Sequence, residues 1–178
     1  MGTKEKIIAT TTDLLFEKGF HGTRIDEITE RSKISKGSIY YYFPKGKKEL
    51  CIESLKLHTM QLSLNYKGLF NNSENLKGGL DKIIDNCDIE LNKSNFRKGS
   101  LLVNISQEIN SHQKDLQNIC KDLFELIIHT FESFFLIHKI IDWQKNARVF
   151  VFKLNGAIVL SKACRNTIFL NDLKNEYS

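Results

Sequence analysis

Residues 35–43 of this 178-residue chain have the sequence SKGSIYYYF and are followed directly by Pro44, Lys45 and Gly46. Ser35 is a favourable N-cap, because its hydroxyl can accept a hydrogen bond from a free N–H in the first helical turn. Pro44 has to end the helix, since proline lacks the N–H and the space that another turn needs. The stretch therefore predicts a short helix that covers residues 36–43.

Another short helix precedes it. Thr23 stands just before Asp26 and Glu27, which predicts an N-cap with acidic residues in the first turn and a helix ending near Ser32. Upstream, apolar residues at helical spacing predict a first helix that stops at Gly19. Two short helices joined by a tight turn form a helix-turn-helix candidate.

The side chains of the 36–43 helix divide between a core face and outer faces. Ile39 and Phe43 are four residues apart, so they share one face, which we assign to a small core. The other faces carry Lys36, Gly37, Tyr40 and Tyr41. Exposed tyrosines suit a nucleic-acid surface, because the ring can contact sugars and thymine methyl groups while the hydroxyl reaches phosphate oxygens.

The positive charge is concentrated in the same region. The net charge is +5, and residues 31–48 contain six lysines and arginines and no acid, so the rest of the chain sums to −1. This stretch therefore indicates an anionic partner, although a solvated face would show the same charge pattern. Lys36, Lys47 and Lys48 fall in first helical turns, where they oppose the helix dipole but suit phosphate binding.

The rest of the chain also has helical periodicity. Helices are predicted to begin at Lys47 and to cover 76–91, 100–110, 116–135, 147–165 and 168–177, and no segment alternates as a strand does. One proline and ten glycines are too few for a turn-rich β fold. We expect an all-α protein with a helix-turn-helix DNA-binding domain at 1–46 and a helical ligand-binding and dimerisation domain at 47–178.

Several function classes are disfavoured. The chain has no phosphate-binding glycine loop, HExxH motif or nucleophile elbow, so we expect neither an enzyme nor a cofactor. The four cysteines form no CxxC pair, and His129 and His138 point to different helical faces, so no metal site is expected. Redox sensing through Cys87 and Cys120 is an open but weaker alternative. With no signal peptide or membrane span expected, the predicted location is the cytoplasm.

Four segments resemble the TetR family of transcriptional repressors. Three lie in the N-terminal part: GFHGTRIDEI at 19–28, SKGSIYYYF at 35–43 and KKEL at 47–50. The fourth, GSLLVNISQE at 99–108, is similar to the LmrA-type branch of that family. The branch often has cysteine at the position of Ser100, and the turn over 43–47 is longer than the commonest form.

The resemblance implies a homodimeric repressor that binds a palindromic double-stranded DNA operator and is released by a small-molecule effector. Carried onto this sequence, it implies base contacts from Lys36, Gly37 and Tyr40. It also implies phosphate contacts from Thr23, Ser35, Ser38, Tyr41, Tyr42 and Lys47.

The C-terminal part then supplies dimerisation and effector binding. The apolar helix at 147–165 is the expected dimer element, with the candidates Phe150, Leu154, Gly156, Ala157, Ile158 and Ser161. Polar or aromatic side chains on apolar helices are the pocket candidates: His58, Gln61, Asn65, Cys87, Asn104, Gln107, Phe124, Phe131 and Trp143. Such a lining favours an apolar or weakly polar effector.

The alternative is a helical module whose basic N-terminal face binds an acidic protein instead of an operator. Only the salt dependence and the sequence preference of binding separate these two functions.

Overall fold

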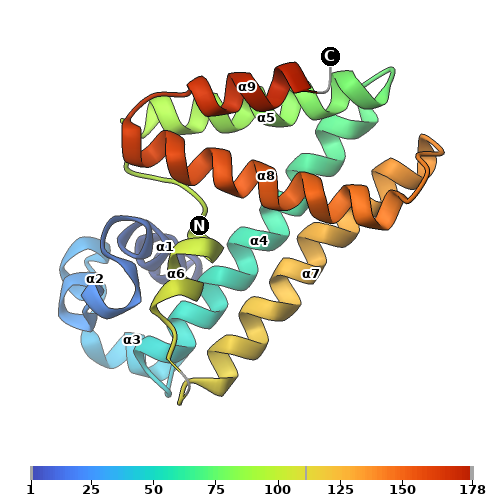
Figure 1. Cartoon of the computed structure of the whole chain (residues 1–178). Coiled ribbons are helices and arrows are strands. Elements are labelled where there is room, and N and C mark those ends of the chain that lie inside the picture. Colours follow the sequence, from blue (N-terminus) through green and yellow to red (C-terminus); the bar gives the residue numbers. More distant parts are fainter. Residues whose placement is uncertain (1, 111, 177–178) are drawn as a thin grey trace. The chain divides into compact units, whose positions relative to one another are not determined.

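The computed structural model describes residues 2–110 and 112–176, and every regular element in those ranges is an α-helix (Figure 1). The predicted all-α fold is therefore confirmed. In chain order the helices are α1 (Thr3–Gly22), α2 (Ile25–Ser32), α3 (Lys36–Tyr42), α4 (Lys47–Asn71), α5 (Leu76–Lys93), α6 (Leu101–Glu108), α7 (Lys114–Ile137), α8 (Trp143–Cys164) and α9 (Ile168–Glu176). The predicted end of the last helix at Tyr177 lies outside the described residues.

The chain divides into two compact units. Unit 1 consists of Met1–Thr59 and Leu101–Leu123, and unit 2 consists of Met60–Ser100 and Phe124–Ser178. Unit 1 thus contains α1, α2, α3 and α6 together with the first parts of α4 and α7. The functional boundary expected after residue 46 remains a prediction, because the compact unit extends beyond it.

The core of unit 1 fixes the short helices. Ile39 of α3 and Phe43, which caps the end of α3, are almost fully buried, as the face assignment predicted. They belong to one apolar cluster with Ile7, Ile8, Leu14, Ile28 and Leu50, against which Ile25 and Ile34 also pack. Full burial of one such side chain stabilises the fold by about 1.5–3 kcal/mol. Two anchors on one face therefore hold α3 and leave its other faces free.

The end of α1 differs from the prediction. The chain leaves helical geometry at Gly19 (φ 69°, ψ −172°), as expected, but resumes a helical turn that ends at Gly22. A positive φ favours glycine, because no Cβ clashes there. The result is a kink with one extra turn rather than a helix end.

Unit 2 has a core rich in phenylalanine. The rings of Phe70 and Phe134 are stacked with their centroids 3.7 Å apart, and those of Phe131 and Phe150 are 4.9 Å apart. Gly79 of α5 permits this packing, since a Cβ there would lie 2.3 Å from Phe134 Cζ. Helix α8 packs on α9 and α5. In the part of the chain that the structure describes, no helix has the length and apolarity needed to cross a membrane.

Candidate nucleic-acid interface

Helix α3 is held at its start by Ser35. The backbone N–H of Ser38 donates to Ser35 Oγ at 3.1 Å, which is the cap that the sequence predicted. The two serine hydroxyls are also 2.9 Å apart. Because Ser35 and the first residues of α3 remain accessible, the N-terminus of this short helix is both ordered and open to a ligand.

The three tyrosines of α3 are all at the surface. Tyr41 is 80% exposed, Tyr40 43% and Tyr42 37%. The rings of Tyr41 and Tyr42 meet edge to face with centroids 5.1 Å apart. Leaving large rings in water gains no burial energy, so their placement favours a surface that is covered in a complex.

Gly37 lies on the same surface and is not required by the fold. A Cβ built there would have Ser35 Oγ, at 3.9 Å, as its nearest neighbour among the described atoms. Alanine would fit and would favour the helix. The packing of this chain gives no reason for a glycine, whereas close approach of a ligand to the backbone would.

The charge of Lys36 is balanced by an acid of α2. Its Nζ donates to Asp26 Oδ1 at 2.9 Å, and both side chains are well exposed. This hydrogen bond lowers the pKa of Asp26 and raises that of Lys36 relative to their ordinary values. The pair offsets the unfavourable position of a cation at a helix start, and binding of a phosphate by Lys36 would have to compete with it.

The first turn of α4 also carries two lysines. Lys47 Nζ lies 4.6 Å from the centroid of the Phe20 ring, a cation–π contact. Lys48 donates to Asp115 Oδ2 at 2.5 Å, and this bond lowers the pKa of Asp115. Lys47 is therefore more available to an anion than Lys48.

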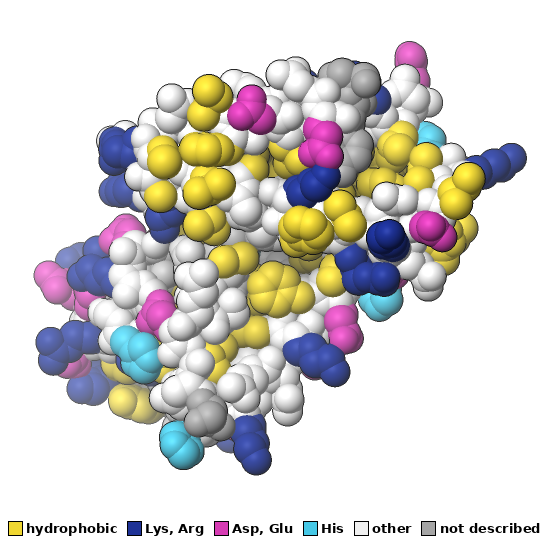
Figure 2. All heavy atoms as spheres, viewed as in Figure 1, with side chains coloured by type: hydrophobic (Ala, Val, Ile, Leu, Met, Phe, Trp, Pro, Cys, Tyr) yellow, Lys and Arg dark blue, Asp and Glu magenta, His cyan; other side chains and the backbone are white. Residues whose placement is uncertain are grey.

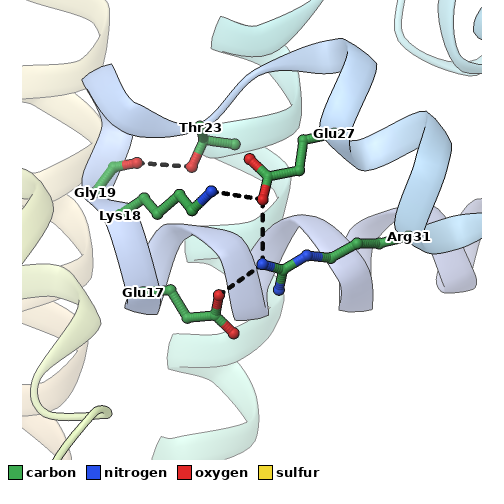
Figure 3. Close-up of polar contacts among 6 residues, drawn as sticks. All are labelled: Glu17, Lys18, Gly19, Thr23, Glu27 and Arg31. Carbon is green, nitrogen blue, oxygen red and sulfur yellow. Dashed lines mark hydrogen bonds and ion pairs between the residues drawn. The ribbon is translucent and has the colours of Figure 1, made fainter.

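Arg31 has a structural role, although it is part of the basic stretch. Figure 3 shows its guanidinium between Glu17 at 2.9 Å and Glu27 at 3.1 Å. Lys18 also donates to Glu27, at 2.6 Å, and lowers the pKa of that carboxyl. These pairs join α2 to α1, so Arg31 contributes less to an anion-binding surface than its charge suggested.

Thr23 is the candidate that the structure does not place on the surface. Its side chain is fully buried, and Oγ1 donates to the carbonyl oxygen of Gly19 at 2.7 Å (Figure 3). The hydroxyl is therefore used in a hydrogen bond inside the fold. Its expected phosphate contact therefore has no accessible side chain to make it.

Other cations were not singled out from the sequence. Arg24, Lys33 and Lys45 are exposed near the ends of α2 and α3. Lys33 has a left-handed backbone (φ 57°) at the end of α2. Lys33 and Lys45 lie in the 31–48 stretch, so its charge was the available signal, whereas Arg24 lies outside it.

The pocket candidates are dispersed. His58, Asn104 and Gln107 lie in unit 1, and the other candidates lie in unit 2. Within unit 2, Cys87 and Phe131 share a core cluster against which Trp143 packs, and Cys87 Sγ lies 3.8 Å from the hydroxyl of buried Tyr66. Gln61 and Asn65 are exposed, and Phe124 is half-buried. The structure thus groups three of the candidates.

The thiols are poorly suited to redox sensing. Burial raises the pKa of Cys51 to about 12 and those of Cys87 and Cys120 to about 11. Cys164, in contrast, is exposed. The described residues also contain no group of three or more histidine, cysteine or acidic side chains that would hold a metal ion.

The dimer candidates point mostly inward. Five of them are buried inside unit 2: Phe150, Leu154, Ala157, Ile158 and Ser161. Gly156 is exposed. Helix α8 is apolar on several faces, so helical spacing alone did not show which face packs internally. The exposed apolar side chains are instead Phe152, Val159 and Leu160 of α8 and Ile168 of α9.

A capped, cationic and tyrosine-rich second helix of a helix-turn-helix defines a DNA-binding regulator. Comparison with known proteins agrees. Residues 7–53 match the model of bacterial regulatory proteins of the tetR family, and residues 78–176 match the LmrA/YxaF-like C-terminal domain of transcriptional regulators. The chain belongs to the TetR family of transcriptional regulators, which are not enzymes, and both the predicted family and its LmrA-type branch are confirmed.

Individual relatives support this assignment. An HTH-type transcriptional regulator in the lacX 3′ region of Lactococcus lactis subsp. lactis is 31% identical over 126 residues, which are 68% of this chain and 64% of that relative. The match spans 56–64% of the length of the first three curated relatives.

Solved structures share the fold. A TetR regulator from Legionella pneumophila has a TM-score of 0.88 and 23% identity, with 99% of this chain and 96% of that chain covered. A cysteine mutant of the TetR-family regulator CifR, complexed with 26-bp operator DNA, has a TM-score of 0.85 and 16% identity, with 97% and 93% covered.

Proposed function

We propose that this regulator is a homodimeric repressor that reads a palindromic operator with α3. The observation that carries the proposal is the outer surface of α3. Lys36, Gly37 and Tyr40 are exposed there, while Ile39 and Phe43 anchor the opposite face. A helix fixed in this way presents side chains to base edges in the major groove at little cost in conformational entropy.

Phosphate contacts would surround this reading surface. The accessible candidates are Ser35, Ser38, Tyr41, Tyr42 and Lys47, and we add Lys33 and Lys45 because both are exposed nearby in the chain. Hydroxyls and ammonium groups position a protein on the duplex without specifying its sequence. Thr23 is not retained as a side-chain contact, because its hydroxyl is buried and bonded.

Dimerisation would use the exposed apolar side chains of unit 2. Figure 2 shows apolar side chains at the surface over α8 and α9. Phe152, Val159 and Leu160 lie along one stripe of α8, and exposed Gly156 within that stripe allows close approach of another helix. A two-fold dimer presents two reading helices to half-sites about 34–36 Å apart, which explains a palindrome.

Effector binding would involve the phenylalanine-rich part of unit 2. Tyr66 is 3% exposed, and its hydroxyl contacts only the weakly polar Cys87 thiol among the described residues. Such a lining favours an apolar or weakly polar molecule that accepts a hydrogen bond from the phenol. Thermal-shift screening of a hydrophobic compound library tests this part, and no stabilising compound is the contrary result.

The test of operator binding is a genomic DNA pull-down with the purified full chain at moderate and at high salt. A specific regulator should enrich one palindrome that survives at moderate salt, with affinity falling steeply as salt rises. Uniform retention that disappears in salt would contradict operator recognition and favour the acidic-partner module.

Two variants then separate the roles of the interface residues. Lys47→Ala should weaken binding to all duplexes alike, because an ammonium that contacts phosphate carries no sequence information. Tyr40→Ala should also reduce the preference for the enriched palindrome. If neither variant changed operator affinity, α3 would not be the reading helix.

A further inference from the structure

The last residue of α6 is bonded to the kink in α1. The backbone N–H of Phe20 donates to Glu108 Oε1 at 3.1 Å, and that of His21 donates to Oε2 at 2.9 Å. The carbonyl oxygen of Glu108 also lies 3.2 Å from His21 Nε2. Both carboxylate oxygens are therefore used on the chain just after Gly19, although 88 positions separate Phe20 from Glu108.

The kink explains why these N–H groups need an outside acceptor. Gly19 has φ 69° and ψ −172°, so the turn over 20–22 restarts without the carbonyls of a regular preceding turn. Free N–H groups at a helix start are well satisfied by a carboxylate. Glu108 takes the place that an N-cap side chain would take in a local sequence.

A side chain at Gly19 would also displace this carboxylate. A Cβ at Gly19 would lie 1.8 Å from Glu108 Oε1 and 2.6 Å from Cδ. The positive φ favours glycine at this position, and glycine also leaves room for the Glu108 carboxylate. The kink in α1 and the Glu108 side chain of α6 thus form one contact, called the α1–α6 joint below, between two helices that pack together within unit 1.

From this joint, contacts lead to the candidate DNA surface. The Phe20 ring lies beneath the ammonium of Lys47, and the Gly19 carbonyl accepts from Thr23 at the start of α2. In the sequence, the 60–100 segment of unit 2 directly precedes α6. Glu108 therefore contacts the backbone that leads into α2 and α3.

We infer that Glu108 is a positioning residue that fixes the α1–α2 connection, and with it Lys47, for operator binding. The DNA part of this inference rests on the proposed function. Loss of the carboxylate would leave the turn at 20–22 in several conformations, and operator binding would then have to select the competent one.

The test compares Glu108→Ala and Glu108→Gln with Asp122→Asn, an exposed acid of α7 in the same unit that undergoes the same charge change as the glutamine variant. Amide hydrogen exchange is measured by NMR on the full free chain. We expect the Phe20 and His21 amides to exchange about tenfold or more faster in Glu108→Ala, with a smaller change in Glu108→Gln, which keeps one acceptor oxygen. Core amides of unit 2 should not change, which separates a local joint from general destabilisation.

Affinity for the selected duplex is the second readout. We expect Glu108→Ala to weaken it about tenfold, Glu108→Gln less, and Asp122→Asn not at all. Unchanged exchange at Phe20 and His21, or an affinity loss no larger than that of Asp122→Asn, would overturn the inference. Failure of the wild-type chain to select any duplex would instead contradict the proposed function, while the exchange experiment on the free chain still decides whether Glu108 fixes the turn.

Discussion

Two glycines of unit 1, Gly19 and Gly37, differ in whether the fold itself explains them. Gly19 is favoured by the fold, because its φ is positive and its lack of a Cβ leaves room for the Glu108 carboxylate. Gly37 has an ordinary helical environment with open space around it. At the scale of single residues, the structure therefore separates a glycine that the fold favours from one that only a ligand would need.

This contrast predicts the behaviour of Gly37→Ala. Folding stability should stay equal or rise by about 0.5–1 kcal/mol, since alanine favours the helix. Operator affinity should fall, because the new methyl group would stand between α3 and the DNA. Thermal unfolding and duplex titration measure the two effects. Gly68→Ala, at another open helical position, is the control that should change stability only, and unchanged operator affinity in Gly37→Ala would contradict a backbone approach.

Asp26 is expected to tune specificity through Lys36. The Asp26 carboxylate lies 2.9 Å from the Lys36 ammonium. It places a negative charge beside the outer surface of α3 and pairs with the lysine in the free chain. Asp26→Asn should raise affinity for random duplexes several-fold and for the operator less, which lowers the specificity ratio. Titration of both duplexes over a salt series measures this. The exposed Glu30 of the same helix provides the matched control Glu30→Gln, and an equal gain in that variant would show that only net charge matters.

At the scale of elements, α8 shows how one helix serves two surfaces. Its inner side contributes Ala147, Phe150 and Leu154 to the core of unit 2, while Phe152 is 62% exposed and Leu160 48%. A helix that is apolar on both sides needs partners on both sides. The inner partners are α5 and α9, and the outer one is proposed to be a second copy.

The outer surface can be tested on α9. Ile168 is 51% exposed and Ile89 of α5 is 50% exposed, so a charge at either position should disturb folding little. Ile168→Glu is expected to shift the chain from dimer to monomer and to weaken palindrome binding, whereas Ile89→Glu should do neither. Light scattering coupled to size-exclusion chromatography measures the mass. Dimers that persist in Ile168→Glu would place the interface elsewhere.

At the scale of the whole molecule, burial divides the thiols. Cys51, Cys87 and Cys120 lie inside their units, and only Cys164 among the four is exposed. Burial raises the pKa of each inner thiol to about 11 or 12. Their reactive thiolate form is therefore disfavoured at neutral and mildly alkaline pH.

Thiol titration of the native chain at about pH 8 should accordingly detect one fast-reacting group. Unfolding in denaturant should release all four. A Cys164→Ser variant should have no fast-reacting thiol, and fast reaction of a second cysteine would revive the redox alternative for Cys87 or Cys120.

The division into units also limits what residue patterns alone can assign. Each pocket candidate is predicted from the pattern of a single helix. The structure distributes the candidates over both units, with Cys87 and Phe131 in one cluster against which Trp143 packs. For α3, spacing alone predicted the buried and exposed faces correctly, because Ile39, Phe43 and the tyrosines lie within about two helical turns.

Local chemistry in the sequence determined the short helix α3 and which of its faces is buried. Three local features predict this helix: the Ser35 cap, the stop at Pro44 and the four-residue spacing of Ile39 and Phe43. Each acts within a few residues, so each can be predicted without knowing any distant contact. The same holds for the all-α class, which follows from periodicity.

Only the tertiary structure decided which polar and apolar side chains are available to a partner and which are used inside the fold. In the folded chain the Thr23 hydroxyl is buried and Arg31 is paired with two glutamates. One face of α8 packs inside unit 2, and Glu108 contacts the kink in α1. Each of these depends on how separate helices pack, and side-chain spacing along one helix contains no information about the partner that another helix supplies.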